Sequence, residues 1–173
     1  IRWETTMTWN VGVDYGFFGE RLSGSIDAYV RDTKDLLNSV QIPLGSNFGN
    51  KLMTNVGSIR NKGLEFSISG VPVQTNDLSV HLGFNGTFQS TEFTRLNLTE
   101  DRNYYIETGT ISKGTGGYLC RQMVGYAPYT YYLYKQKYDS SGKPLQNEFV
   151  DIDGDGEITD GDRYMTGKRA APK

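Results

Sequence analysis

The residues with the clearest chemistry lie in an acidic, glycine-containing segment near the end of the sequence. In the run DIDGDGEITDGD over residues 151–162, acidic residues occupy positions 1, 3, 5 and 12 and glycine occupies position 6. This is the spacing of a calcium-binding loop, and Ca²⁺ takes about six to eight oxygen ligands. Most of that shell is expected from the carboxylates of Asp151, Asp153, Asp155 and Asp162 and from the main-chain carbonyl of Glu157.

A bare acidic turn is the alternative to a metal site. Asp162 is shorter than the glutamate that usually closes such a loop through two oxygens. The preceding residues 131–138 have the pattern of a strand or loop rather than of an EF-hand helix. Without a cation, on the other hand, the carboxylates would repel one another. A bound Ca²⁺ is expected to be structural, because the loop leaves no obvious open coordination position for chemistry.

A dense run of tyrosines ahead of the acidic loop is the second candidate site. A tyrosine combines an apolar ring face with a polar hydroxyl, so exposed rings can stack on sugars or on peptide side chains. Alternatively, the rings pack together and hold an extracellular hairpin in place. The candidate substrate-binding residues are Tyr129, Tyr131, Tyr132 and Tyr134.

No arrangement of catalytic residues is evident. His81 is the only histidine, so a Ser-His-Asp or Cys-His site would have to include it. Its position between Val80 and Leu82 favours a hydrogen-bonding group on the polar face of a strand. Cys120 is the only cysteine, which excludes an internal disulfide and favours a small packed side chain. The sequence therefore predicts that the protein is not an enzyme.

Composition excludes two classes of protein. The 173 residues carry 18 basic and 20 acidic side chains, a formal net charge of −2. The basic residues form no cluster of the kind that binds a phosphate backbone, so nucleic acid is not an expected partner. Apolar runs are short and interrupted, which excludes membrane-spanning helices of about 20 apolar residues.

The elements that must position these residues are strands, because apolar residues recur with a period of two. The alternation covers residues 9–17, 22–30, 64–69 and 78–88. In the first segment the apolar face holds Trp9, Val11, Val13, Tyr15 and Phe17, and the opposite face holds Asn10, Gly12, Asp14 and Gly16.

The connections favour a membrane β-barrel. Short links at 18–21 and 71–77 alternate with a long loop at 32–62 and with the long region after residue 90, as in outer-membrane barrels with tight periplasmic turns and long extracellular loops. We expect residues 1–90 to form four antiparallel barrel strands, and 91–173 to form a long extracellular loop region with a Tyr-rich hairpin and the calcium-like loop. The apolar faces would then meet lipid, whereas a soluble β-sandwich would bury them.

Three strings carry a family resemblance: NVGVDYGFFGERLSGSIDAYVRDTKDLL at 10–37, NVGSIRNKGLEFSIS at 55–69 and FVDIDGDGEITDGDRYMTGKRAAPK at 149–173. Together they resemble the C-terminal half of the SusC/RagA family of TonB-linked outer-membrane proteins of Bacteroidetes. The resemblance implies an all-β, antiparallel segment of a 22-stranded barrel in the outer membrane. It also implies import of glycans or peptides with a SusD-like lipoprotein, driven by the TonB system.

The resemblance also implies that parts of the transporter lie elsewhere. The plug domain and TonB-contacting segment of that family precede the barrel, and no string here matches either. Four to six strands cannot close such a barrel, and open edges in lipid cost several kcal/mol for each unpaired group. We therefore expect these residues to belong to a longer polypeptide. The alternative is a soluble, secreted β-sandwich module that is stabilised by calcium and binds a glycan.

Overall fold

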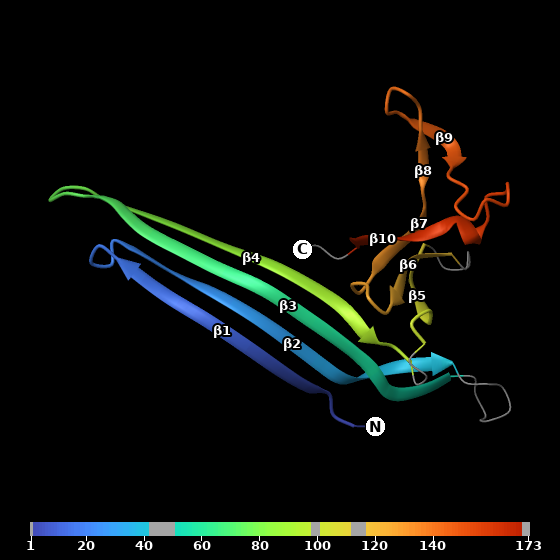
Figure 1. Cartoon of the computed structure of the whole chain (residues 1–173), viewed down its shortest axis with the longest axis horizontal. Helices are drawn as coiled ribbons and strands as arrows, with labels where there is room; N and C mark the ends of the chain where they lie inside the picture. Colours follow the sequence, from blue (N-terminus) through green and yellow to red (C-terminus); the bar gives the residue numbers. More distant parts are fainter. Residues whose placement is uncertain (1, 42–50, 98–100, 112–116, 171–173) are drawn as a thin grey trace. The chain divides into compact units, whose positions relative to one another are not determined.

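The computed structural model describes residues 2–41, 51–97, 101–111 and 117–170, and it divides into two compact units, Ile1–Glu100 and Asp101–Lys173. The first unit is one antiparallel sheet of four strands in sequence order (Figure 1). These strands are β1 (Thr5–Phe17), β2 (Leu22–Gln41), β3 (Lys51–Gln74) and β4 (Ser79–Arg95). Among the described residues, no helix has the length and hydrophobicity needed to span a bilayer.

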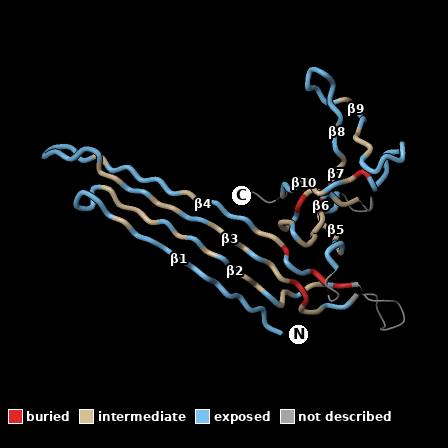
Figure 2. The backbone as a smooth tube through the Cα atoms, in the orientation of Figure 1, coloured by how far each residue is buried: buried red, intermediate tan, exposed pale blue. Residues whose placement is uncertain are grey.

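The strand register confirms the two faces expected from the period of two. In the central row of the sheet, Val13 lies opposite Ile26, Ile26 opposite Phe66, and Phe66 opposite Gly86. On both sides of this row apolar residues continue on the same face, from the row of Trp9 and Val30 at one end, past the row of Leu22 and Leu82, to the pair Val73 and Val80. The face is not a dry core: Val13 is 62% exposed, Ile26 48% and Leu82 62%. Figure 2 shows how little of these strands is buried.

The opposite face of the same sheet is polar. Its central rows place Ser25 opposite Ser67, whose hydroxyls are 2.9 Å apart, and Asp27 opposite Glu65. His81 also lies on this face, where its Nε2 is 3.0 Å from the hydroxyl of Ser79. The sheet therefore separates an exposed apolar surface from a surface that can hydrogen-bond with water.

The apolar face has the height of a barrel band. Trp9 and Phe17 are eight residues apart in β1, which is about 27 Å along a strand. A tilt of about 40° reduces this to about 21 Å along the membrane normal, close to the apolar band of about 25 Å in outer-membrane barrels. One row beyond Lys62 on the same face, Arg60 forms an ion pair with Asp32 at 2.7 Å.

The prediction of a long loop at 32–62 is wrong for most of these residues, which are strand. β2 continues to Gln41 and β3 begins at Lys51. The pairing runs through Leu37 opposite Asn55, with register shifts next to Leu36 and a left-handed Asp35. Polar side chains occupy both faces in this part, so the period of two disappears although the backbone remains paired. Residues 42–50 of the expected loop lie outside the described residues.

A small apolar core closes this end of the first unit. Val40, Val56, Phe93 and Leu96 are each less than 9% exposed, and the Asn38 side chain donates a hydrogen bond of 3.2 Å to the Leu96 carbonyl. Because β4 continues to Arg95, the unit extends past the boundary expected at residue 90.

The second unit, expected as a loop region, contains a sheet of four short strands in the order β10-β7-β6-β5. The prediction of a Tyr-rich hairpin is wrong. Tyr131, Tyr132 and Tyr134 lie in β7, which pairs with β6 and β10 in the sheet, whereas Tyr138 lies in the separate β8-β9 hairpin. The tyrosines are in a sheet and not in a hairpin because β7 pairs with β10, a strand that is distant in sequence. The bounds are β5 (Tyr105–Thr110), β6 (Tyr118–Met123), β7 (Thr130–Tyr134), β8 (Gln136–Tyr138), β9 (Pro144–Phe149), η1 (Asp160–Asp162) and β10 (Arg163–Arg169).

Candidate metal loop and tyrosine-arginine cluster

The acidic loop is wound around its own carboxylates. Asp151 accepts hydrogen bonds from the main-chain N–H groups of Gly154 at 2.6 Å and Gly156 at 2.9 Å. Both glycines have a positive φ, of 79° and 88°, a conformation that favours glycine over residues with a Cβ. This winding places one carboxylate oxygen each of Asp151, Asp153 and Asp155 within 4.8 Å of one another.

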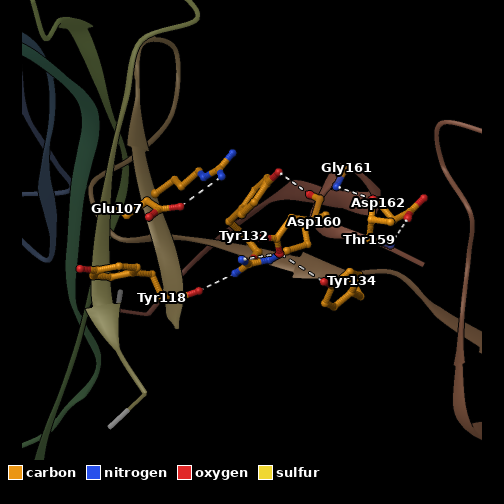
Figure 3. Close-up of polar contacts among 10 residues, drawn as sticks. Glu107, Tyr118, Tyr132, Tyr134, Thr159, Asp160, Gly161 and Asp162 are labelled. Carbon is orange, nitrogen blue, oxygen red and sulfur yellow. Dashed lines mark hydrogen bonds and ion pairs between the residues drawn. The ribbon is translucent and has the colours of Figure 1, made fainter. Parts of the chain in front are cut away.

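Asp162 closes the loop from its far end. Its side chain is fully buried and accepts hydrogen bonds from the N–H groups of Ile152 at 2.6 Å and Thr159 at 2.8 Å. These two bonds lower the pKa of Asp162. Thr159 in turn caps η1 by accepting a hydrogen bond from Gly161 (Figure 3). Asp162 therefore connects the beginning of the loop to its end.

Negative charge is concentrated at Asp153. The N–H of Asp155 lowers the pKa of Asp153, but burial and the carboxylates of Asp155, Asp162 and Asp151 together raise it above its usual value. Repulsion of this kind would be relieved by a cation held among the same oxygens. The residues thus fit a hard, oxygen-binding ion such as Ca²⁺. Glu157 donates its N–H to Asp155 at 2.8 Å.

A stack of tyrosines and arginines occupies the sheet of the second unit. The Arg121 guanidinium lies 3.8 Å from the ring centre of Tyr105 and 3.5 Å from that of Tyr132, within the range of cation–π contacts. Arg121 also forms an ion pair of 3.2 Å with Glu107. This group, with Arg163 and Tyr134, is the tyrosine-arginine cluster.

Arg163 connects the cluster to the acidic loop. Its guanidinium donates to the carbonyls of Tyr132, at 2.9 Å, and Tyr118, and it lies 3.5 Å from the carboxylate of Asp160. Tyr134 donates its hydroxyl to the same Asp160 carboxylate at 3.3 Å (Figure 3). Burial and the Asp160 carboxylate raise the pKa of Tyr134. Asp160 therefore ties the loop to β7 and β10.

The four tyrosines expected to bind substrate have different environments. Tyr132 is 9% exposed and lies against two guanidinium groups. The ring centre of Tyr134 is 5.3 Å from that of Phe149. Tyr131 is half-buried. Only Tyr129 among the four has an exposed ring, at 49%. The contacts of Tyr132 and Tyr134 are those of packed side chains.

Sequence reasoning missed the two arginines of the cluster. In the sequence, Arg121 and Arg163 appear only as isolated cations in aromatic segments. Which rings they contact depends on pairing between strands that are distant in sequence. Cys120, the neighbour of Arg121, is 3% exposed, and burial raises the pKa of its thiol. A buried, protonated thiol is a poor nucleophile.

The first unit defines a class of protein: a segment of an antiparallel β-barrel wall with one apolar and one polar face. In agreement, the chain belongs to the family of TonB-dependent receptor-like β-barrels, whose model matches residues 1–169. This confirms the resemblance and the barrel fold expected from the sequence. It also confirms that the chain belongs to a receptor family and not to an enzyme family.

Individual relatives agree with this assignment. The chain is 46% identical over 171 residues to the TonB-dependent receptor SusC of Bacteroides thetaiotaomicron, covering 98% of this chain and 17% of that protein. It is 34% identical over 122 residues to the TonB-dependent receptor P39 of Formosa agariphila, covering 70% of this chain and 11% of that protein. The chain therefore spans less than a fifth of these relatives.

A solved structure shows the same fold. The structure of the RagAB peptide transporter matches with a TM-score of 0.69 at 27% identity, over 98% of this chain and 18% of that chain.

Proposed function

We propose that this chain forms part of the wall of a TonB-dependent outer-membrane transporter, which imports glycans or peptides together with a SusD-like lipoprotein. The observation that carries the proposal is the exposed apolar face of β1–β4, seen together with 46% identity to SusC over nearly the whole chain. An apolar face that is exposed along four strands needs hydrocarbon or a second layer to cover it. Within the described residues of this sheet, no second layer covers it.

In this proposal the two faces of the sheet have separate tasks. Val13 and Ile26 contact the hydrocarbon of the bilayer, while Ser25, Ser67 and Asn85 line the wet interior of the barrel. The long connections and the second unit lie outside the cell and shape the cavity that the lipoprotein closes. Energy comes from the TonB system through a plug domain in another part of the polypeptide.

The acidic loop is proposed as a structural Ca²⁺ site in the outer part of the transporter. Asp151, Asp153, Asp155 and Asp162 would hold the ion, with the Glu157 carbonyl as a further ligand. The ion would neutralise the carboxylates and thereby stabilise the connection through Asp160 to the tyrosine-arginine cluster. Among the four candidate tyrosines, the exposed Tyr129 is the best placed for stacking on a substrate.

Uptake by cells tests the proposal. Bacteria that carry the full polypeptide should take up labelled oligosaccharides or peptides only when both TonB and the adjacent SusD-like lipoprotein are present. Ile26→Arg, in the centre of the apolar face, should reduce the level of assembled protein in the outer membrane, because an arginine facing mid-bilayer costs about 2–4 kcal/mol. Asn85→Arg on the polar face is the control. A protein that is monomeric in buffer without detergent would instead support the soluble glycan-binding module.

A further inference from the structure

A groove interrupts the apolar face of the first unit near its tight turns. It encloses about 600 Å³ and lies over β2, β3 and β4. Gly70 causes it: the residues directly opposite are Leu22 on one side and Leu82 on the other, so a row of large side chains has a gap at its centre. Ile68 and Phe84 form the wall toward the middle of the band.

Arg21 stands at the rim of this groove. The register shifts between Gly70 and Val73, and there the Arg21 side chain donates to the carbonyls of Val71 at 3.2 Å and Pro72 at 3.5 Å. Both bonds come from Nη2. In the part of the chain that the structure describes, Nε and Nη1 have no acceptor and Arg21 has no acidic partner. The guanidinium is held in place with unused donors.

The neighbouring carboxylate does not neutralise Arg21. A Cβ built on Gly16 would lie 2.5 Å from the Glu20 carboxylate, and Gly16 belongs to the polar face of β1. The Glu20 side chain therefore turns to the opposite face of the sheet. The groove side carries an uncompensated positive charge next to an apolar channel, an arrangement complementary to an anionic head group with a hydrocarbon tail.

We propose that this groove is a phospholipid-binding site, in which one acyl chain lies over Gly70 and the lipid phosphate pairs with Arg21. The inference rests on the proposed membrane location of the apolar face. The depth is suitable: Leu22 is in the last apolar row of β1 and β2 and Arg21 precedes it in the turn, while β3 and β4 add one further apolar pair, Val73 opposite Val80. The cation therefore lies at the edge of the apolar band, where head groups begin. The tight turns place the site in the periplasmic leaflet.

Native mass spectrometry of the full polypeptide in detergent tests the site. With phosphatidylglycerol added, we expect one tightly retained lipid. Arg21→Gln should weaken its retention about tenfold, the effect of losing a charged hydrogen-bonding partner, and Arg21→Lys should restore part of it. Gly70→Leu should also abolish retention by filling the groove. The backbone accepts a side chain here, because a Cβ at Gly70 would make ordinary contacts, 3.6 Å from the Arg21 carbonyl oxygen and 3.8 Å from the Leu22 side chain.

Lys62→Gln is the matched control, because Lys62 is a cation on the same face of β3 at the other end of the band. Retention by this variant should equal that of the wild type, and glycerol 3-phosphate, which has the head-group charge without acyl chains, should not displace the lipid. Equal retention in all variants, or displacement by glycerol 3-phosphate, would overturn the proposal. A protein that needs no detergent would instead overturn the proposed function.

Discussion

The guanidinium of Arg121 lies 3.5 Å from the ring centre of Tyr132, and a second ring, that of Tyr105, lies on its other side at 3.8 Å. The Arg121 side chain is only 16% exposed, so the charge is stabilised mainly by the two rings and by Glu107. One side chain from β6 thereby joins β5 to β7, in a unit that has few fully buried apolar residues.

Replacing Arg121 by lysine should loosen this sheet. Lysine keeps the charge but loses the planar group that lies between the rings, and a cation–π contact contributes about 1–2 kcal/mol when it is partly desolvated. Amide hydrogen exchange in β6 and β7 should report a local loss of this size, with β2 and β3 unchanged. Arg169→Lys, at a β10 residue without a ring contact in the described chain, should have little effect. Equal exchange in both variants would show that the stacking contributes nothing.

Removing one carboxylate from the acidic loop should weaken Ca²⁺ binding at least tenfold. Asp153→Ala removes a proposed ligand, and calorimetric titration of the metal-free full protein measures the change. Asp139→Ala is the control: Asp139 is an exposed aspartate whose carboxylate is bonded within its own turn, to Ser141 and Lys143. The metal site is excluded if Asp153→Ala binds Ca²⁺ as tightly as the wild type.

The acidic loop should open at low pH. The pKa of Asp162 is lowered in the folded state by the N–H groups of Thr159 and Ile152, so its contribution to stability is fully present above the unfolded value of about 3.9. This contribution is lost as the pH falls from about 4 through the lowered pKa of Asp162. Hydrogen exchange at residues 152–159, corrected for the intrinsic rate, should accelerate over this range.

The variant Asp162→Asn provides the comparison for the pH experiment. It lacks the titrating group, so its loop should exchange faster than that of the wild type at neutral pH. A steep increase below pH 4 that persists in Asp162→Asn would assign the acid transition to another group.

A methyl group at Gly86 should destabilise the assembled protein by about 1–3 kcal/mol, the usual effect of overpacking. A Cβ there would lie 2.6 Å from the Phe66 ring, which is stacked on Phe88 with 6.2 Å between ring centres. Denaturant unfolding of Gly86→Ala in lipid vesicles measures the loss. Gly83→Ala on the opposite face of β4, where a Cβ has no neighbour within 4 Å, should behave like the wild type. Similar unfolding of the two variants would contradict this packing.

The sequence predicts the sheet well where one face must be apolar. The alternation in residues 9–17 and 22–30 identifies both faces, because the side-chain period of a strand is two wherever only one side is covered. The same signal fails at 32–41 and 51–62, where polar residues occupy both faces and the ladder is maintained by main-chain hydrogen bonds that carry no side-chain pattern.

The second unit could be predicted only in part. The acidic loop is recognisable because the ligand spacing is local, and the structure places the carboxylates of Asp151, Asp153 and Asp155 close together. The tyrosine-arginine cluster is not local: Arg163 meets Tyr132 because β10 pairs with β7, a contact between residues that are distant in sequence. Composition indicates an aromatic region there, but not which cation stacks on which ring.

The ion pair between Asp32 and Arg60 has a consequence for insertion. The pair lies one row beyond Lys62 on the apolar face. In the proposed membrane location, moving the sheet inward by two residues would transfer both charges from water into hydrocarbon. At the other end of the apolar face, Arg21 would oppose a shift in the opposite direction for the same reason. If the apolar face lies in the bilayer as proposed, these charged groups oppose a shift of the sheet in either direction and thereby fix its depth.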